Sequence, residues 1–299
     1  MATKNNNPFR SVLITGISGL VGSTVFRMIQ GLADEITGIY HHLPFKEPGL
    51  TRCLSQNLTD LNSLERLLAD IKPSLVINCA ACSDIAPCEA DPVTALRINA
   101  EVPECIARFC NNQGARLIHL STDLVFDGRQ GVYVESDPVR PVHEYGRSKA
   151  KGEQAVASAN PEALTMRIAL VYGRSYSGQR SASEKFLADI KAGREIRLFT
   201  NEWRCPVLVD DVAQAVLFFG KNDVYGIIHV AGRDRVNRLD IGRAMAKHFG
   251  LDDKLLVPAL SQGLNAVPPR PLDLSLNINL ASSLLPFKLK GLAQGLATL

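Results

Sequence analysis

The sequence contains 299 residues, of which 46% are hydrophobic and 21% are charged, as is usual for a globular protein. The net charge is only +3 and no block of Lys or Arg stands out, so binding to nucleic acid or to an anionic membrane is not expected. No segment approaches the ~20 consecutive apolar residues that span a bilayer. Residues 1–8 are polar and are expected to form a disordered tail, and seven scattered Cys favour a reducing, cytoplasmic location.

Short apolar runs alternate with amphipathic segments through the first half of the chain. Strands are predicted at residues 10–15, 35–40, 74–81, 115–122 and 163–172, and helices at 20–32, 61–71, 93–112 and 144–159. This alternation is typical of a parallel sheet with crossover helices on both faces. The predicted fold class is therefore α/β, with a Rossmann-type doubly wound sheet over residues 9–168.

The second half of the chain is less regular. Helices are predicted at residues 183–192, from an Asp cap near residue 210, and at 238–250, with strands at 194–199 and 226–231. We expect residues 169–299 to form a smaller α/β substrate-binding region that is partly interleaved with the Rossmann domain.

A glycine-rich turn follows the first predicted strand and opens the first predicted helix. Gly16 suits a tight turn, Gly19 lets the backbone approach a pyrophosphate, and Gly22 lets helix and sheet pack closely. The turn, which also contains Ser18, Leu20 and Val21, predicts a dinucleotide-binding site, because a helix N-terminus attracts anions. Alternatively, the three glycines serve only the turn itself.

The end of the second predicted strand bears on the choice between NAD and NADP. An acidic residue there would accept hydrogen bonds from the ribose 2′-hydroxyl of NAD, but the strand ends in Tyr40, His41 and His42. Histidines can face a 2′-phosphate, so NADP is favoured over NAD. The alternative is a solvated loop in which the histidines are incidental.

Three polar residues form a candidate reactive site. Tyr145 and Lys149 are four residues apart on a predicted helix, so both lie on one face, and an ammonium near a phenol favours proton exchange. Thr122 ends a predicted strand and can hydrogen-bond the same substrate oxygen. This trio suits carbonyl reduction, although Tyr and Lys at this spacing are often just an amphipathic pair.

Cys79 and Cys82 raise the question of a metal site. With Cys88 or with the adjacent His41 and His42 they could supply zinc ligands. Cys79 ends an apolar run, however, where a buried thiol simply packs, so no metal is expected.

Taken together, these segments resemble the extended short-chain dehydrogenase/reductase superfamily, and within it the dTDP-4-dehydrorhamnose reductase-like group of sugar-nucleotide reductases. The resemblance spans nearly the whole chain through TGISGLVG (15–22), VINCAA (76–81), RINA (97–100), GARLIHLSTDLVFDG (114–128), EYGRSKAKGE (144–153), RIALVYG (167–173), PVLVDDVAQAV (206–216) and RPLDLSLN (270–277). It implies that Thr122, Tyr145 and Lys149 are catalytic, and that Asn99 supports the Lys and a relay water.

The resemblance also implies a ligand for each part of the fold. NADP or NAD binds the first ~165 residues, and a nucleotide-sugar, a 4-keto-6-deoxy sugar that is reduced, binds the cleft beside the C-terminal region. Further expected cofactor contacts are Asn57, Leu58, Cys79, Ala80, Ala81 and Ile168, besides Tyr145 and Lys149. A homodimer is compatible with this resemblance.

Some positions depart from the family pattern. Leu124 and Leu170 stand where the family has Tyr and Trp, which removes stacking surface from the expected sugar pocket, and Arg204 could pair with a diphosphate or lie at the surface. Two alternatives therefore stay open. The chain could be an NADP-binding regulatory protein resembling the methionine adenosyltransferase regulatory subunit, or a nucleotide-sugar epimerase or dehydratase in which Asp123 acts beside Thr122.

Overall fold

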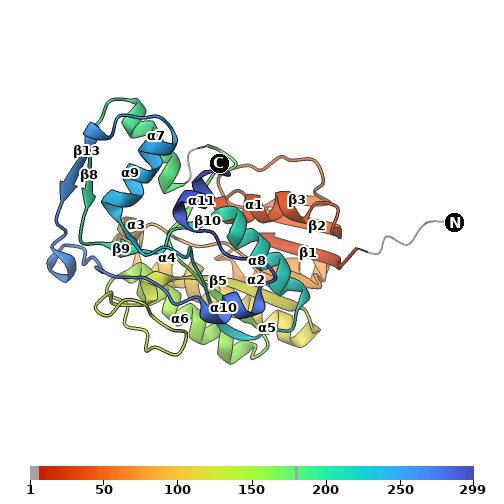
Figure 1. Ribbon diagram of the computed structural model, residues 1–299. Coiled ribbons are helices and arrows are strands. Elements are labelled where there is room, and N and C mark those ends of the chain that lie inside the picture. The colour runs from red at the N-terminus through yellow and green to blue at the C-terminus, as the bar shows by residue number, and fades with distance from the viewer. Residues whose placement is uncertain (1–6, 179–180) are drawn as a thin grey trace.

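The computed structural model describes residues 7–178 and 181–299, and its centre is a seven-stranded sheet in which all neighbouring strands are parallel (Figure 1). The strand order is β11 (Gly226–Val230), β6 (Leu164–Ile168), β5 (Arg116–Thr122), β4 (Leu75–Asn78), β1 (Phe9–Thr15), β2 (Ala33–Tyr40) and β3 (Arg52–Ser55). The predicted doubly wound α/β class is confirmed.

The central strands are continuous apolar runs because both faces of the sheet are covered. In β1, Val12, Leu13 and Ile14 are all fully buried, with successive side chains on opposite faces. Val12 and Ile14 join the core under one helical layer, whereas Leu13 joins the core under the other.

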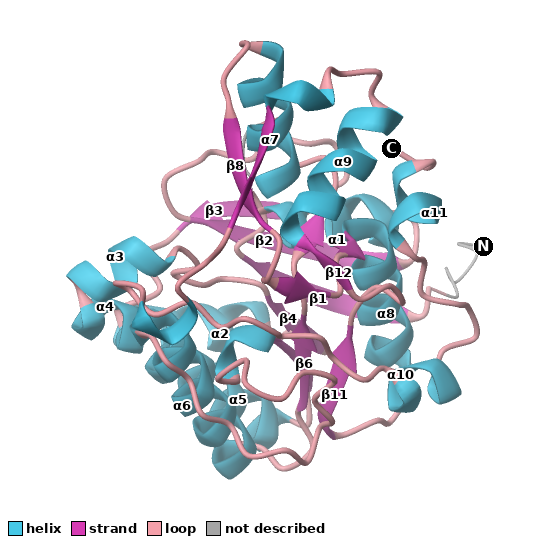
Figure 2. Ribbon diagram, turned by 60° about the vertical axis from the view of Figure 1, so that its left-hand side comes forward, coloured by secondary structure: helices cyan, strands magenta, loops and turns pink. Residues whose placement is uncertain are grey.

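Helices cover the two faces of the sheet (Figure 2). One layer contains α1 (Leu20–Ile29), α8 (Val209–Lys221) and α10 (Asn279–Leu284), and the other contains α2 (Leu61–Ile71), α5 (Val102–Gln113) and α6 (Glu144–Ala159). The helix predicted at 93–112 is present, but it comprises α4 (Pro92–Leu96), a π-helical turn η1 (Arg97–Glu101) and α5. The short helix α3 (Ile85–Ala90) precedes it.

A smaller lobe lies above the carboxyl ends of the strands and has its own apolar core (Figure 1). Its elements are α7 (Ala182–Lys191), β8 (Ile196–Phe199), α9 (Arg238–His248), η3 (Asp253–Leu255), β13 (Leu256–Ala259), η4 (Gly263–Asn265) and α11 (Leu292–Leu296). Short strand pairs join the lobe to the sheet: β7 (Val171–Tyr172) with β10 (Val207–Leu208), and β9 (Trp203–Arg204) with β12 (Val236–Asn237).

The chain returns from the lobe to the main sheet, so the two regions are interleaved. After β6 the chain builds α7 and β8 in the lobe, and α8 and β11 then pack on or join the sheet. The strand predicted at 163–172 is correspondingly broken into β6 and β7.

The helix predicted to begin near residue 210 is present, but its predicted Asp cap is wrong. Helix α8 begins at Val209 with Leu208 as its N-cap, and no side chain caps it. Asp211 is buried instead and accepts a hydrogen bond from the backbone N–H of Lys290 at 2.6 Å, so its carboxylate ties the C-terminal segment to α8.

Of the predicted tail at 1–8, residues 1–6 lie outside the described part of the chain. Within the described part, no helix has the length and apolar character needed to cross a membrane.

Candidate active site

A cleft of about 640 Å³ opens at the carboxyl ends of the strands, between the sheet and the lobe. Strands β1 and β4 are neighbours, but the chain proceeds from them toward opposite edges of the sheet. Such a switch point leaves a crevice, because the loops that follow the two strands diverge. The cleft is lined there by the loop after β1 and by residues 79–81 after β4.

The glycine turn forms one end of the cleft, and two of its glycines are required by close approach. Gly16 has φ +64°, and a Cβ there would lie 2.9 Å from the backbone nitrogen of Ala80. A Cβ on Gly22 would lie 2.4 Å from the carbonyl oxygen of Gly16. Helix α1 begins after Gly19 without a side-chain cap, so its first N–H groups are available to an anion. These features fit the pyrophosphate of a dinucleotide.

The loop after β2 lies at the side of this turn. The imidazole rings of His41 and His42 lie 3.6 Å apart, centroid to centroid, and both line the cleft together with Asn57 and Leu58. Tyr40 is not among the described lining residues, and its backbone carbonyl accepts a hydrogen bond from Gln56.

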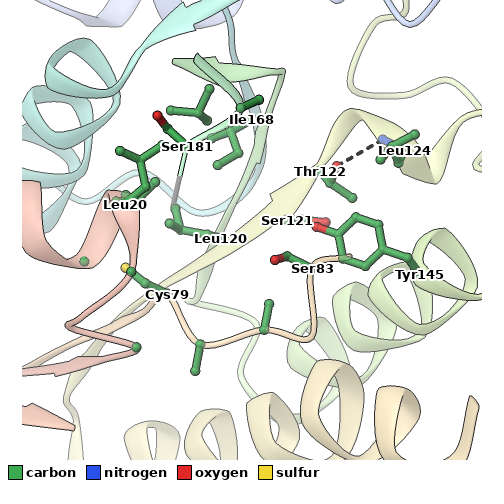
Figure 3. Close-up of a pocket in the computed structure, with 18 of the residues that line it drawn as sticks. Leu20, Cys79, Ser83, Leu120, Ser121, Thr122, Leu124, Tyr145, Ile168 and Ser181 are labelled. Atoms are coloured by element: carbon green, nitrogen blue, oxygen red, sulfur yellow. Dashed lines mark hydrogen bonds between the residues drawn. The ribbon is translucent and has the colours of Figure 1, made fainter. Parts of the chain in front are cut away.

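Tyr145 and Thr122 meet at the opposite end of the cleft. Figure 3 shows the phenol ring pointing from α6 toward the end of β5, where Thr122 lies, with Ser83 beside it. The Thr122 hydroxyl oxygen accepts from the backbone N–H of Leu124 at 3.2 Å, and the hydroxyl donates to Asp123 Oδ1 at 3.1 Å. Burial raises the pKa of Tyr145 well above its usual value, and a hydrogen bond to Thr122 opposes that rise. The phenol is therefore neutral and carries a proton, although burial also makes it a weaker acid than a free tyrosine.

Lys149 is buried beneath this end of the cleft rather than being among its described lining residues. Its Nζ donates to the carbonyl oxygen of Leu120 at 2.6 Å and lies 3.4 Å from Nε2 of His119. Burial lowers the pKa of Lys149 to about 8, while the carboxylate of Glu153 opposes this shift. The lysine thus holds the end of β5, two residues before Thr122.

Asn99 lies behind the residues that line the cleft and holds two segments of the chain together. It lies in the π-helical turn η1, and its side chain binds both the backbone N–H and the carbonyl oxygen of Cys82, each at 3.0 Å. The Asn99 amide also donates to the Ser148 hydroxyl at 2.9 Å, and that hydroxyl donates to the carbonyl oxygen of Tyr145. Asn99 therefore joins the loop after β4 to the helix that carries Tyr145.

Charged residues of the lobe complete the cleft. Arg204, Arg238 and Arg270 line it, and the buried carboxylate of Glu202 lies among them. Arg270 binds Glu202 through Nε at 2.5 Å and Nη2 at 3.0 Å, and Nε of Arg238 lies 3.8 Å from Glu202 Oε2. Sequence reasoning missed Arg238 and Arg270 as cleft residues. The position of Arg238 carries no local pattern that points to the cleft, whereas Arg270 opens the family motif RPLDLSLN, which could have indicated it.

Arg204, which the sequence suggested either as a diphosphate ligand or as a surface residue, is buried and is occupied by backbone contacts. Its Nη1 donates to the carbonyl oxygen of Trp203 at 2.7 Å, and its Nη2 donates to that of Pro271 at 3.1 Å. The guanidinium is buried, and its charge partly offsets the effect of burial on Asp123, whose pKa is raised to about 6. Arg204 thus closes the floor of the cleft near Thr122.

The structure brings most of the predicted site residues together and places three behind the lining. The cleft is lined by Gly16, Ser18, Gly19, Leu20, Val21, Gly22, His41, His42, Asn57, Leu58, Cys79, Ala80, Ala81, Thr122, Tyr145 and Ile168. Tyr40, Asn99 and Lys149 are the three behind it. Leu124 and Leu170, the departures from the family pattern, both line the cleft.

The thiols near the cleft do not form a metal site with their neighbours. Among the described residues, no group of three or more His, Cys, Asp or Glu is arranged to hold a metal ion. Burial raises the pKa of Cys79 to about 12, so this residue is a neutral thiol in the lining.

The family model for the RmlD substrate binding domain matches residues 10–299. The chain belongs to this family. The resemblance drawn from the sequence is thereby confirmed, and it extends over the whole of the described fold.

Proteins with different names are similar to this chain. A probable low-salt glycan biosynthesis reductase, Agl14, of Haloferax volcanii is 35% identical and covers 86% of each chain. The dTDP-4-dehydrorhamnose reductase of Mycobacterium tuberculosis is 35% identical over 72% of this chain and 71% of its own. The methionine adenosyltransferase 2 subunit beta of Xenopus laevis is 30% identical over 87% of this chain and 78% of its own.

A solved structure has the same fold as this chain. A hypothetical dTDP-4-dehydrorhamnose reductase from Sulfolobus tokodaii superposes with a TM-score of 0.83 and 28% identity, covering 95% of this chain and 98% of that one. The proteins similar to this chain thus include both reductases and a subunit of another enzyme, and the chemistry of the cleft must distinguish between these functions.

Proposed function

We propose that this protein is an NAD(P)H-dependent reductase of a nucleotide-linked 4-keto-6-deoxy sugar. The observation that carries the proposal is the placement of Tyr145 and Thr122 at one end of a cleft whose other end is the glycine turn at the start of α1. A neutral phenol beside a hydroxyl is a proton donor with a positioning partner, which is what carbonyl reduction requires.

Each residue has a defined task in this reaction. The nicotinamide, when bound, supplies the hydride. Tyr145 donates its proton to the substrate oxygen. The Thr122 hydroxyl, which donates to Asp123 Oδ1 in the structure, turns its proton to that oxygen when substrate is bound and so fixes the orientation of the carbonyl. Lys149 positions the end of β5 through the Leu120 carbonyl, and its contact with the cofactor ribose stays a prediction.

The cofactor is assigned to the sheet side of the cleft. The turn from Gly16 to Gly22 and the N-terminus of α1 would hold the pyrophosphate, with His41 and His42 at the adenosine end. The carboxylate found among the described lining residues belongs to Asp123, at the far end, so no acid faces the adenosine ribose. This arrangement favours NADPH over NADH.

The nucleotide-sugar is assigned to the lobe side. Arg238 and Arg270 present guanidinium groups to the cleft from α9 and from the loop before residue 271, and each is partly exposed. Two guanidiniums suit a diphosphate, because their positive charge and N–H groups pair with phosphate oxygens. Arg270, whose Nε and Nη2 already donate to Glu202, would do so through Nη1. Leu124 and Leu170 would then contact the sugar or base with aliphatic rather than aromatic surface.

The test is loss of reduced-nicotinamide absorbance when the protein receives NADPH or NADH and a freshly generated dTDP-4-keto-6-deoxy sugar. We expect consumption that requires the sugar and is faster with NADPH. NADPH binding without consumption would favour the second candidate, a regulatory protein like the methionine adenosyltransferase subunit. Release of a dehydrated or epimerised sugar with no net consumption of reduced nicotinamide would instead favour the hypothesis of an epimerase or dehydratase in which Asp123 acts beside Thr122.

A further inference from the structure

Two cysteines lie against each other at the rim of the cleft. The Sγ atoms of Cys82 and Cys88 are 3.4 Å apart, although six positions separate the residues in the chain. Cys82 is half-buried in the loop after β4, whereas Cys88 is fully buried in α3. Neither residue has a task in the proposed reduction.

The segment between the two cysteines belongs to the wall of the cleft. Ser83 and Ile85 line the cleft, and Cys88 packs in one apolar cluster with Tyr145. Asn99 holds the backbone of Cys82 and connects it through Ser148 to the helix of Tyr145. A change in the distance between the two sulfur atoms must therefore move residues that touch the candidate proton donor.

We propose that Cys82 and Cys88 form a reversible thiol-oxidation site, and that their disulfide deforms this wall of the cleft and lowers turnover. A disulfide requires an S–S distance of about 2.05 Å, so the sulfur atoms must approach each other by more than an ångström. In the loop after β4 the Cys82 backbone is clamped, so Ser83 and Ile85 must take up the displacement.

The oxidant is a hydroperoxide such as hydrogen peroxide. The half-buried Cys82 sulfur attacks a peroxide oxygen, the O–O bond breaks, and water leaves with the thiol proton. The Cys88 sulfur then attacks the resulting sulfenic acid, and a second water leaves with the Cys88 proton. Two thiols become one disulfide, and one peroxide, reduced by two electrons, becomes two waters.

The order of the two steps follows from the environment of each thiol. Burial and the adjacent Cys82 raise the pKa of Cys88 to about 12, so Cys88 is not the thiolate that meets the peroxide. Cys88 is instead the resolving thiol, which acts by proximity. The resulting ring spans only the short segment from Cys82 to Cys88.

The linkage is tested by mass spectrometry on the full chain after treatment with hydrogen peroxide and alkylation of the remaining thiols. Cleavage before Asp84 and Asp91 puts Cys88 on a different peptide from Cys82 and Cys79. We expect these two peptides to be joined in wild type, to stay joined in Cys79→Ser, and to separate in Cys82→Ser, in Cys88→Ser and after dithiothreitol treatment. Because Cys88 is buried and its variant could fail to fold, Cys82→Ser is the decisive variant.

The effect on the cleft is measured as turnover of the reductase, and this arm rests on the proposed function. Peroxide should lower wild-type turnover by at least about tenfold, as expected for a small displacement beside the reacting groups. Dithiothreitol should restore turnover, and Cys82→Ser should resist peroxide. Cys53→Ser, which removes a half-buried thiol from β3, is the matched control and should behave as wild type.

Two results would overturn the proposal: peroxide treatment that leaves the two peptides unjoined, or a joined pair with unchanged turnover. If the reduced wild-type protein shows no turnover at all, the proposed function has failed, but the peptide map still shows whether Cys82 and Cys88 form a disulfide. In that case the affinity for NADPH, measured by fluorescence in the reduced and the oxidised protein, replaces turnover as the measure of the cleft. Equal affinity in the two forms would overturn the proposal that the disulfide deforms the cleft.

Discussion

The Nζ atom of Lys149 lies 3.4 Å from Nε2 of His119, and both side chains are buried beneath the end of β5. Burial lowers the pKa of both groups, that of His119 to well below its usual value and that of Lys149 to about 8. The imidazole is therefore neutral at pH 7 and the amine is still largely protonated.

This burial predicts that Lys149 makes stability depend on pH. In the unfolded chain the lysine pKa is 10.5, so between pH 8 and 10.5 the unfolded state holds a proton that the folded state lacks, and stability rises with pH. Between pH 7 and pH 10, the free energy of unfolding measured in urea should rise by roughly 1–3 kcal/mol more in wild type than in Lys149→Met. A pKa difference of one corresponds to about 1.4 kcal/mol.

The neighbours of the amine set the control for this measurement. Glu153 and Cys79 are the charged or titratable groups that act on it besides His119. Lys151→Met removes an exposed lysine from the same helix and should show no such pH-dependent difference. A difference for Lys149→Met that stays flat or falls with pH would contradict the assigned burial of the charge.

Tyr145→Phe is expected to reduce turnover by about 10²–10⁴-fold, because it removes the proton donor and little of the binding surface. NADPH affinity, measured by fluorescence titration, should change by less than about threefold. Tyr225→Phe, which alters an exposed tyrosine outside the cleft, should keep full turnover. A fully active Tyr145→Phe protein would falsify the proton-transfer role.

Gly22→Ala is expected to destroy NADPH binding. Its Cβ would lie 2.4 Å from the Gly16 carbonyl oxygen, so the turn that is proposed to hold the pyrophosphate must shift. Gly114→Ala is the matched control, because nothing lies within 4 Å of the Cβ that it adds. The φ of +66° at Gly114 is strained for alanine. The control should lose about 1–2 kcal/mol of stability and bind NADPH normally. Equal NADPH affinity in the two variants would argue against the cradle.

Arg167→Leu is expected to destabilise the protein by about 3–5 kcal/mol, because it leaves a buried carboxylate without its partner. Arg167 binds Glu153 through Nε at 3.0 Å and Nη2 at 2.7 Å, and both side chains are at most 5% exposed. The double variant Arg167→Leu/Glu153→Leu should recover much of this loss in urea unfolding. A double variant less stable than Arg167→Leu would show that Glu153 is supported mainly by Ser121 and other neighbours.

Replacing His41 and His42 together by Ala tests the choice of cofactor. If they face the 2′-phosphate, the Kd for NADPH should rise by about tenfold, while the Kd for NADH changes little. His248→Ala, which alters a histidine in the last turn of α9, is the control. A parallel change for both cofactors would indicate a structural role for the stacked rings instead.

Several elements could be predicted from the sequence because their signals are local. Helix α2 (Leu61–Ile71) and helix α6 (Glu144–Ala159) have the predicted bounds, since apolar spacing and capping residues act within a few turns. The glycine turn after β1 could also be predicted, because its form depends on the backbone conformation of adjacent residues. Strand β3 and the short strands β9 and β12 were missed, since their few residues pair only with distant segments.

The sequence by itself determined the doubly wound sheet, the glycine-rich turn after the first strand and the identity of the candidate reactive residues, because alternation, glycine spacing and family motifs are properties of neighbouring positions. Only the tertiary structure decided that Lys149 is buried and donates to the carbonyl oxygen of Leu120. It also decided that Arg238 and Arg270 line the cleft while Arg204 donates to backbone carbonyls. The contact of Cys82 with Cys88 near Tyr145 is likewise a tertiary feature. The physical reason is that burial and hydrogen-bond partners are set by packing between segments far apart in the chain, and these decide which polar groups remain free to act.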